Sequence, residues 1–581
     1  MTNTIRYIIA GALMLLIIVL QPVYMKWLGY DTSQPDLEQT SQAQTINPAT
    51  EETKKYIPAI PSQEDFSLPN DALETFITIS TPLYTTTLSN RSGGSIEDYT
   101  LTGENSGKLK YLGGYDKNGF FQSDLPVSIV LPSVDHCNPC LGHYDDVDDQ
   151  YHFINQPFML ASNYIENDTI YLNPGESFEL RYSLKSPNGS VLIDKFVSFS
   201  ADEYISQHRF EINDDELIYS NNLELIWYGG LRPTEEKDNE DVEYGSGIIG
   251  QAGEIEDIQT KDPDEEISRS VYNGQTEWVA VRTKYFMSAL IVENPGKYAV
   301  LSAGNVAFGG RKQTPVYHAG IGYPLDIKYI SSKLYLGPLD VDHLIKTGTN
   351  LDATMNWGFT LIRPISKGIL WVLKFMHNAL RLNYGLVLLL FALIIRLITG
   401  PLTKKSYESS QNMQKLQPQI KKLQAKYKKD PQRLNRETMG LYKKHKVNPL
   451  GGCLPIMLQM PLLWALFIVF RTTIEFRGAS FVFWISDLSQ PDVIFNLPFS
   501  IPIYGSGVAV LPLLMGATLM LTMRMSSATM DKSQKPVMYF MNGFFILLFN
   551  TFPSGLNLYY TAYNVLSYFQ QRSIKRKLAV P

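Results

Sequence analysis

One arginine stands inside the longest apolar stretch of the C-terminal half. Arg396 is the only charged residue in the run 384–402, and Lys404 and Lys405 follow directly. A cation inside a membrane helix costs about 3 kcal/mol, so it generally faces protein or water and serves a function. A helix rises 1.5 Å per residue, which places Arg396 roughly 11 Å from the surface marked by Lys404. Because its charge could attract anionic groups of a passing ligand, we take Arg396 as the candidate functional centre.

Neutral polar side chains are the expected surroundings of this arginine. The other apolar runs of the C-terminal half contain no acidic residue that could pair with it. The candidate neighbours of Arg396 in these runs are uncharged: Gln459, Thr518, Thr522, Asn550, Asn557, Tyr559, Tyr560 and Asn564. An unpaired cation among such groups needs water, so we expect a hydrated cavity open to the cytoplasm. The alternative is an arginine that snorkels to the surface, although snorkelling residues usually lie near a helix end.

Charge is divided between two regions of the chain. Residues 29–340 contain 21 Lys and Arg against 48 Asp and Glu, whereas residues 341–581 contain 28 against 9. An acidic polar region joined to a basic apolar one indicates a protein with parts in two compartments. The apolar N-terminal run has no small-residue cleavage site, so we expect residues 1–28 to form a transmembrane signal-anchor with a cytoplasmic N-terminus. A cleaved signal peptide is the alternative. Residues 29–70 have the composition of a flexible linker.

Residues 71–340 have the pattern of an exported all-β domain. Short runs alternate apolar and polar residues between turn-forming clusters, which is typical of antiparallel strands in a β-sandwich. The clearest runs are 75–79, 127–131, 178–182 and 223–227. The acidic stretch 234–266 is expected to be an exposed excursion. A carbohydrate-active enzyme is an alternative for this domain, but no catalytic carboxylate pair can be picked from the sequence.

The pattern becomes helical near residue 341. In the region 341–383, apolar residues share one helical face, and Lys367, Lys374, Asn378 and Arg381 share the opposite one. This charge density predicts an amphipathic helix that lies in the membrane interface rather than crossing the bilayer. A core helix of the β-domain is the alternative.

The C-terminal region 384–581 is predicted to cross the membrane five times. The apolar runs are 384–402, 453–470, 508–523, 537–552 and 556–571. Residues 403–446 carry 13 Lys and Arg against three acidic residues, so they should be cytoplasmic, and the acidic loop 475–507 should lie outside. With the signal-anchor this makes six spans and places both termini in the cytoplasm. Several runs are about 16 residues, or about 24 Å of helix, so the bilayer should thin around them.

The cytoplasmic segment 403–446 is predicted to be a helical hairpin. Apolar residues recur at three-and-four spacing, as in a coiled-coil seam: Met413, Leu416, Ile420, Leu423 and Tyr427. Asp430 and Pro431 then supply an N-cap and a first helical residue. A basic hairpin suits contact with RNA, anionic lipid or an acidic partner helix. The alternative is that its charges only fix the topology.

Three short motifs resemble those of one family. The first is Asn448-Pro449-Leu450-Gly451-Gly452-Cys453-Leu454-Pro455 with Gln459-Met460-Pro461, the second is Phe552-Pro553-Ser554-Gly555-Leu556 with Leu558-Tyr559-Tyr560, and the third is Arg396 with Pro401-Leu402-Thr403. Together they resemble the YidC-type membrane protein insertases of the YidC/Oxa/Alb family. The chain departs from the family pattern at Ala392, one turn before the arginine, where a polar residue often stands.

The resemblance implies a non-enzymatic insertase and folding chaperone of a Gram-negative inner membrane, with no cofactor. The periplasmic domain would be a β-supersandwich, and the core 384–581 would hold a hydrophilic groove. Arg396 would receive the polar part of a nascent membrane protein, with Gln459, Asn557, Tyr559 and Tyr560 as further groove contacts. The substrate's apolar segment would leave along the third and fifth of six spans. Implied partners are the Sec translocon with its accessory subunits, membrane lipids, and the ribosome and signal-recognition targeting machinery at the hairpin.

A transporter or channel that uses Arg396 as an anion site is the main alternative function. Such a protein would be expected to show an internal repeat between groups of spans, and the sequence shows none. Cys137 and Cys140 have the spacing of a redox motif, but a local disulfide or two idle thiols suits an exported β-domain better. A zinc site with the flanking His136 and His143 is a weaker alternative, and no metal is expected.

Overall fold

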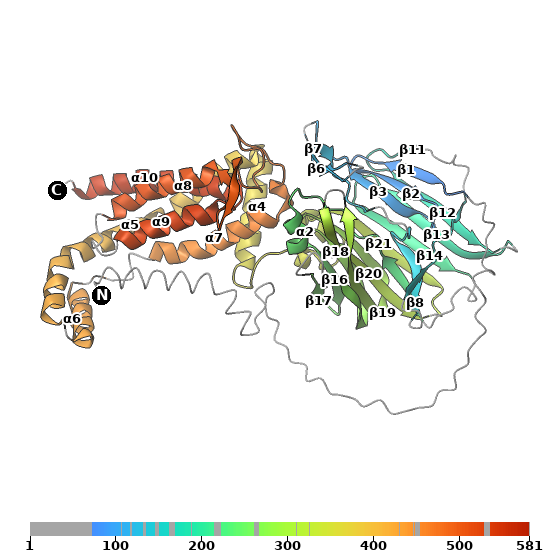
Figure 1. Cartoon of the computed structure of the whole chain (residues 1–581), viewed down its shortest axis with the longest axis horizontal. Helices are drawn as coiled ribbons and strands as arrows, with labels where there is room; N and C mark the ends of the chain where they lie inside the picture. Colours follow the sequence, from blue (N-terminus) through green and yellow to red (C-terminus); the bar gives the residue numbers. More distant parts are fainter. Residues whose placement is uncertain are drawn as a thin grey trace, which may run out of the picture. The chain divides into compact units, whose positions relative to one another are not determined.

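The computed structural model describes residues 73–579, except 106, 117–118, 132–134, 146–149, 162–168, 187–188, 214–221, 261–265, 309–310, 325, 429, 446, 448–453 and 528–534. The predicted signal-anchor 1–28 and linker 29–70 lie outside the described residues. The described chain forms a β-rich unit that ends at Met355 and a helical unit that begins at Asn356 (Figure 1). This boundary divides the region 341–383 that the sequence grouped together.

The β-rich unit is built on one large, mostly antiparallel sheet of 13 described strands and a smaller sheet of four. The order in the large sheet is β10-β12-β13-β14-β21-β19-β20-β15-β8-β9, with β16, β17 and β18 attached beside β19, and the small sheet runs β11-β1-β2-β3. The bounds are β1 Phe76–Ser80, β2 Tyr84–Ser89, β3 Ser95–Leu101, β4 Glu104–Asn105, β5 Lys108–Leu109, β6 Leu112–Tyr115, β7 Phe121–Pro126, β8 Cys140–Asp145, β9 Gln150–Phe153, β10 Met159–Leu160, β11 Thr169–Tyr171, β12 Ser177–Lys185, β13 Val191–Ser200, β14 Ile205–Ile212, β15 Asn222–Trp227, β16 Ser246–Gln251, β17 Glu254–Ile258, β18 Ile267–Arg282, β19 Phe286–Phe308, β20 Arg311–Pro324 and β21 Tyr329–Pro338.

The two sheets share a buried core. Tyr84 of β2 is buried, its ring lies 6.4 Å from that of Tyr204, and its hydroxyl donates to the Ser200 carbonyl, so the small sheet packs on the β13–β14 end of the large one. Trp278 of β18 is fully buried against Gly250 of β16. A Cβ at Gly250 would lie 2.1 Å from that indole, so only glycine lets the two strands approach. The β-sandwich pattern predicted from alternation is confirmed as a β-rich domain.

Three of the four predicted runs are strands, and one is not. Residues 75–79, 178–182 and 223–227 fall on β1, β12 and β15. Residues 127–131 instead make isolated bridges through Ser128 and Val130, although Val127, Ile129 and Val130 are buried. Their apolar character therefore reflects burial in the core rather than pairing in a ladder.

In the described residues, only part of the acidic stretch 234–266 is exposed, and the expected excursion is partly built into the sheet. It contains the helix α2, Asp238–Tyr244, and the buried strand β16, which pairs with β17 and β18. Glu240 of α2 is buried, and its carboxylate lies 3.0 Å from the ammonium of Lys284. The prediction failed because it read charge as exposure, whereas this carboxylate is neutralised by a buried lysine.

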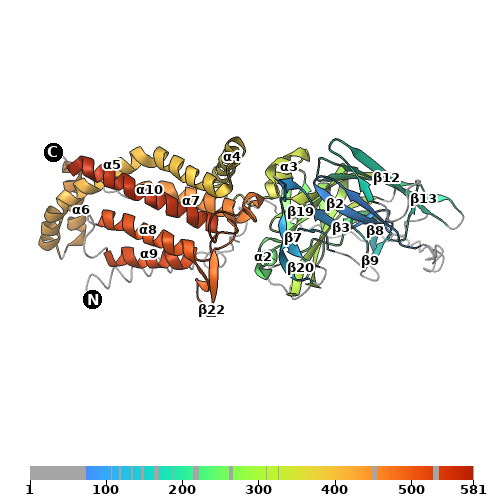
Figure 2. The ribbon, with the colours of Figure 1, turned by 90° about the horizontal axis from the view of Figure 1, so that it is seen from above.

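Most of the helical unit consists of helices that lie side by side (Figures 1 and 2). Among the described residues α10 packs on α5, α8 and α7, while α4 packs on α7 and α5 and α9 packs on α8. The bounds are α4 Arg363–Leu380, α5 Tyr384–Lys426, α6 Pro431–Lys444, α7 Leu454–Thr472, η5 Ile474–Phe476, β22 Val493–Ile501, β23 Gly505–Ala509, α8 Val510–Ser527, α9 Lys535–Phe549 and α10 Ser554–Ala579. The short α3 Val341–Lys346 and η3 Leu351–Thr354 belong to the β-rich unit.

Helix α5 is continuous from the predicted first core span into the predicted hairpin. It begins where Asn383 accepts a hydrogen bond from the backbone N–H of Leu386, and it runs through Pro401 and Pro418 without a break. By length and composition, the segment Tyr384–Met413 is the one described helix that could cross a membrane. The apolar helical segments Gln459–Thr472, Val510–Arg524 and Met538–Phe549 are shorter.

Candidate functional site

Arg396 is held inside the helical unit by the packing of α5 against α10. The side chain is 6% exposed, and its Nη1 donates to the Tyr563 hydroxyl at 3.3 Å. The guanidinium carbon lies 5.3 Å from the centre of the Tyr563 ring, which is close enough for a cation–π contact. One turn further along α5, a Cβ at Gly400 would lie 2.7 Å from the Gln570 amide, so the two helices approach closely here.

The charge of Arg396 is not neutralised within the described residues. Its Nε and Nη2 are buried and have no hydrogen-bond partner there, and no described carboxylate lies within ion-pair distance. Buried donors without partners cost free energy, and the cost is larger when the group is charged. A site that leaves two guanidinium nitrogens unsatisfied therefore favours any anionic or carbonyl-bearing group, or water, that can reach them.

Tyrosines on α10 form an aromatic ladder next to the arginine. Tyr559 lies one turn before Tyr563, their rings are 6.0 Å apart, and the Tyr559–Tyr560 rings are 5.0 Å apart. Tyr559 is fully buried and also meets Phe391 of α5 at 5.8 Å. Its hydroxyl has no hydrogen-bond partner in the described part of the chain. The ladder thus joins the arginine to the predicted contacts Tyr559 and Tyr560.

The predicted residue Gln459 lies beside this ladder, whereas Asn557 serves a turn. Gln459 is half-buried on α7 and is a neighbour of the Tyr560 hydroxyl. Asn557 is fully buried, and its amide nitrogen donates to the carbonyls of Phe549 and Phe552 at 3.1 and 3.3 Å. These bonds close the α9–α10 connection, so only the Asn557 Oδ1, which is buried without a partner among the described residues, is left for another contact.

Other expected neighbours of Arg396 are used elsewhere. Asn550 binds backbone groups of β23 and the turn before it, and the hydroxyls of Thr518 and Thr522 donate to carbonyls of their own helix. The residue that touches the arginine, Tyr563, was not among the predicted contacts. It could have been found from its spacing, because residues four apart share a helical face and Tyr559 had already been selected.

The chain is similar to known proteins over most of its length. Residues 164–372 match the family model described as "YidC periplasmic domain", and residues 375–580 match that described as "60Kd inner membrane protein". A membrane protein insertase YidC of Chlorobium phaeovibrioides is 37% identical over 426 residues, which is 70% of each chain. That of Chlorobium limicola is 32% identical over 571 residues, covering 96% of this chain and 92% of the relative. The chain belongs to the YidC family of membrane protein insertases.

A solved structure of an active YidC insertase with its first transmembrane domain resolved aligns with 88% of this chain and 96% of its own. The two are 16% identical, with a TM-score of 0.33. The chain has the β-rich domain and the helical C-terminal core of this family, and the first matched model extends past Met355 into the helical unit.

The basic hairpin is a packed structure. Leu416 and Ile420 of α5 and Val447 are buried together, with Met413, Leu441 and Tyr442 packed around them. Asp430 caps α6 by accepting from the backbone N–H of Arg433 at 3.0 Å, as predicted, and Pro431 is the first helical residue. The two helices therefore present their basic residues from a fixed scaffold.

Helix α4 has two apolar faces rather than one. Ile369, Leu370, Leu373 and Met376 are buried, while Trp371 and Phe375 are exposed and stack at 5.7 Å. Lys374, expected on the open polar face, is only 16% exposed and lies 3.0 Å from the buried carboxylate of Glu475. The helical pattern could not predict this contact, because Glu475 follows α7 and is about 100 residues away in the sequence.

The β-rich unit contains a disulfide and several histidines close to other side chains. Cys137 and Cys140 form a disulfide, which decides between the alternatives left by the sequence. His136 lies 3.0 Å from Glu97, His143 stacks on His152, and the described residues contain no cluster that could hold a metal ion.

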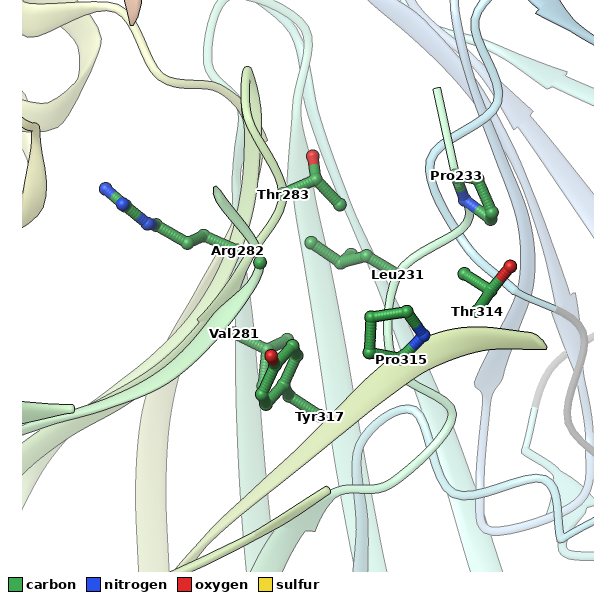
Figure 3. Close-up of a pocket in the computed structure, with 9 residues that line it drawn as sticks. Leu231, Pro233, Val281, Arg282, Thr283, Thr314, Pro315 and Tyr317 are labelled. Carbon is green, nitrogen blue, oxygen red and sulfur yellow. The ribbon is translucent and has the colours of Figure 1, made fainter. Parts of the chain in front are cut away.

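One small pocket opens in the β-rich unit (Figure 3). Its lining residues are Leu231, Pro233, Gly245, Val281, Arg282, Thr283, Thr314, Pro315 and Tyr317. The pocket has a volume of about 10 Å³, room for about one water molecule, and no carboxylate lines it. The Arg282 side chain extends away from the other lining residues and donates to the Thr354 carbonyl, and burial lowers its pKa. The pocket is too small for a sugar.

Proposed function

We propose that this chain inserts nascent membrane proteins into the bacterial inner membrane, acting alone or with the Sec translocon. The relatives that share most of its length are named membrane protein insertases. The observation that carries the proposal for the site is Arg396, a buried cation with two unsatisfied nitrogens among neutral polar groups. Such a cation attracts the polar, acidic or carbonyl-rich part of a segment that is crossing the bilayer, and it releases that part once the segment has moved on.

Five helical spans, with the N-terminal anchor as a sixth, form the membrane core in this proposal. They begin with α5 and continue with α7, α8, α9 and α10. At 1.5 Å per residue, the 15 residues of α9 span about 22 Å, less than the hydrocarbon core of about 30 Å. A bilayer that thins to match would shorten the path of a polar segment.

The substrate leaves between α7 and α9. These two helices are not among the closely packed pairs of the described unit, although each packs on other helices. Exposed apolar side chains line the two: Met460 and Trp464 on α7, and Tyr539 and Phe540 on α9. Gln459, Tyr559 and Tyr560, with the Asn557 oxygen, provide polar contacts between this exit and Arg396.

The basic hairpin 403–446 recruits the ribosome or the signal-recognition targeting machinery. Its 13 Lys and Arg against three acidic residues favour a polyanion such as ribosomal RNA. The rigid packing of Leu416, Ile420 and Val447 supports this role, because charges that only fix topology need no paired helices. Helix α4 would rest in the membrane interface through Trp371 and Phe375.

Photocrosslinking during translation tests the exit path. A photoreactive amino acid at Gln459 or Trp464 on α7, and at Phe540 on α9, should capture a small nascent membrane protein. The control position is Leu513, an exposed apolar residue on α8, which is not one of the two proposed exit helices. Capture at the three test positions and not at Leu513 supports the insertase path. Equal capture at all four positions, or no capture while small anions are transported, would favour the transporter and overturn the proposal.

A further inference from the structure

The loop between α7 and α8 contains a small sheet whose large apolar side chains are unusually exposed. Among the described strands, β22 and β23 pair with each other alone, through Val493 with Ala509, Phe495 with Val508, and Asn496 with Gly507. Large apolar side chains of this hairpin are about half exposed: Val493 43%, Ile494 54%, Phe495 52%, Phe499 61% and Ile503 50%. Every residue of β22 is exposed except Leu497 and Ile501, which are half-buried, so the apolar side chains of this strand lie uncovered.

The hairpin is fixed to the helix ends rather than hanging free. Asn550, at the end of α9, accepts from the Ala509 N–H at 3.1 Å and donates to the carbonyls of Tyr504 and Gly507 at 2.8 and 2.6 Å. The buried Asp492 accepts from the first two N–H groups of α8, at 3.2 Å from Val510 and 2.8 Å from Leu511. Figure 2 shows β22 lying across the ends of α8 and α9. The apolar surface therefore has a defined position at one end of the bundle.

The hairpin is a poor partner for another β-strand. Pro498 and Pro502 have no N–H to donate, and the Asn550 side chain already occupies three backbone groups of β23 and its turn. Edge-to-edge addition of a further strand is therefore disfavoured, although the strands are apolar.

Composition indicates what covers the hairpin instead. Residues 493–523 contain no charged residue, so the strands continue into the apolar helix α8 as one uncharged segment. Beside them Phe483 is 90% exposed and stacks on Trp484, whose indole N–H donates to Asp492 at 2.9 Å. Aromatic residues that stand where an apolar segment meets water are typical of the membrane interface.

We infer that the β22–β23 hairpin inserts into the outer leaflet of the bilayer, at the boundary between head groups and acyl chains. Lipid covers its exposed apolar side chains, and the hairpin holds the outer ends of α8 and α9 at a fixed depth in the bilayer. The inference rests on the proposed function, because it assumes that α8 and α9 cross the membrane.

The test uses the full chain in lipid vesicles, with one environment-sensitive fluorophore at a time. Single cysteines replace Phe495 or Phe499 in a Cys453→Ser background, and the buried Cys137–Cys140 disulfide stays intact. The quenchers are lipids brominated near the head group, lipids brominated near the chain end, and aqueous iodide. Two control positions are Leu547, 38% exposed on α9, and Glu254, exposed on β17.

The inference predicts that labels at 495 and 499 lose most of their fluorescence to the shallow bromines, lose less to the deep ones, and resist iodide. Quenching by iodide as strong as at Glu254 would overturn it. Protection from both lipid and iodide would overturn it too, by showing a protein partner or a second copy on the hairpin. The label at Leu547 separates the two proposals: if it is quenched by lipid while 495 and 499 are not, the spans stand and only the hairpin inference fails.

Discussion

The Lys374–Glu475 ion pair should hold α4 on the helical unit. Its atoms lie 3.0 Å apart, and the side chains are 16% and 6% exposed. Removing one partner of a buried pair costs about 3–5 kcal/mol, because the other charge is left buried. Since Lys374 keeps some contact with solvent, we take the low end for Glu475→Gln, about 3 kcal/mol, which corresponds to about a hundredfold change in an equilibrium.

The assay is amide hydrogen exchange of α4 in lipid nanodiscs. Glu475→Gln should speed exchange of the α4 amides about a hundredfold, because exchange requires the helix to undock. The double variant Lys374→Met with Glu475→Gln should recover most of the loss, since no charge then remains buried. The matched control is the exposed pair Lys404–Glu408 on α5, whose side chains are 62% and 41% exposed. Glu408→Gln should change the exchange rate of the neighbouring α5 amides about twofold at most. A small effect of Glu475→Gln, or a double variant worse than either single one, would refute this reasoning.

Two further predictions follow from other parts of the chain. Burial lowers the pKa of Lys195 to about 7 from its ordinary 10.5. Between these values the unfolded chain binds a proton that the folded unit does not, so the free energy of unfolding should rise with pH, by up to about 5 kcal/mol. Pulse proteolysis in urea would measure this rise; it should vanish in Lys195→Met, and a rise that persists would contradict the assignment. Tyr563→Phe keeps the ring against Arg396 and should lower the insertion rate about fivefold at most, whereas Tyr563→Leu should lower it further. Equal rates in both variants would argue against the ring contact.

Periodicity predicted the elements whose local pattern and tertiary packing agree. Strands β1, β12 and β15 and the Asp430 cap of α6 were predictable because alternation, capping and burial point the same way. The local Cys137–Cys140 disulfide was one of the open alternatives, because spacing alone cannot distinguish a bond from free thiols.

Two of the missed features depend on contacts between distant segments. Lys374 appeared to belong to a solvated face until Glu475 was placed beside it, and Glu240 appeared exposed although Lys284 neutralises it. The run 127–131 has the alternation of a strand, but it makes single bridges to Thr100 and Leu231 instead of a ladder. The β22–β23 hairpin was not predicted, since its uncharged sequence merges with the apolar run of α8. For Lys374 and Glu240 the deciding partner lies outside any local window.

Insertion by purified protein in vesicles tests the role of Arg396 most directly. The assay compares the natural chain with Arg396→Lys and Arg396→Ala, using a small membrane protein whose exported segment becomes protected from protease. If the site supplies a positive charge to the passing polar segment, Arg396→Lys should insert nearly as well as the natural chain and Arg396→Ala should lose most activity. Equal loss in both variants, or full activity of Arg396→Ala, would contradict an electrostatic role for this arginine.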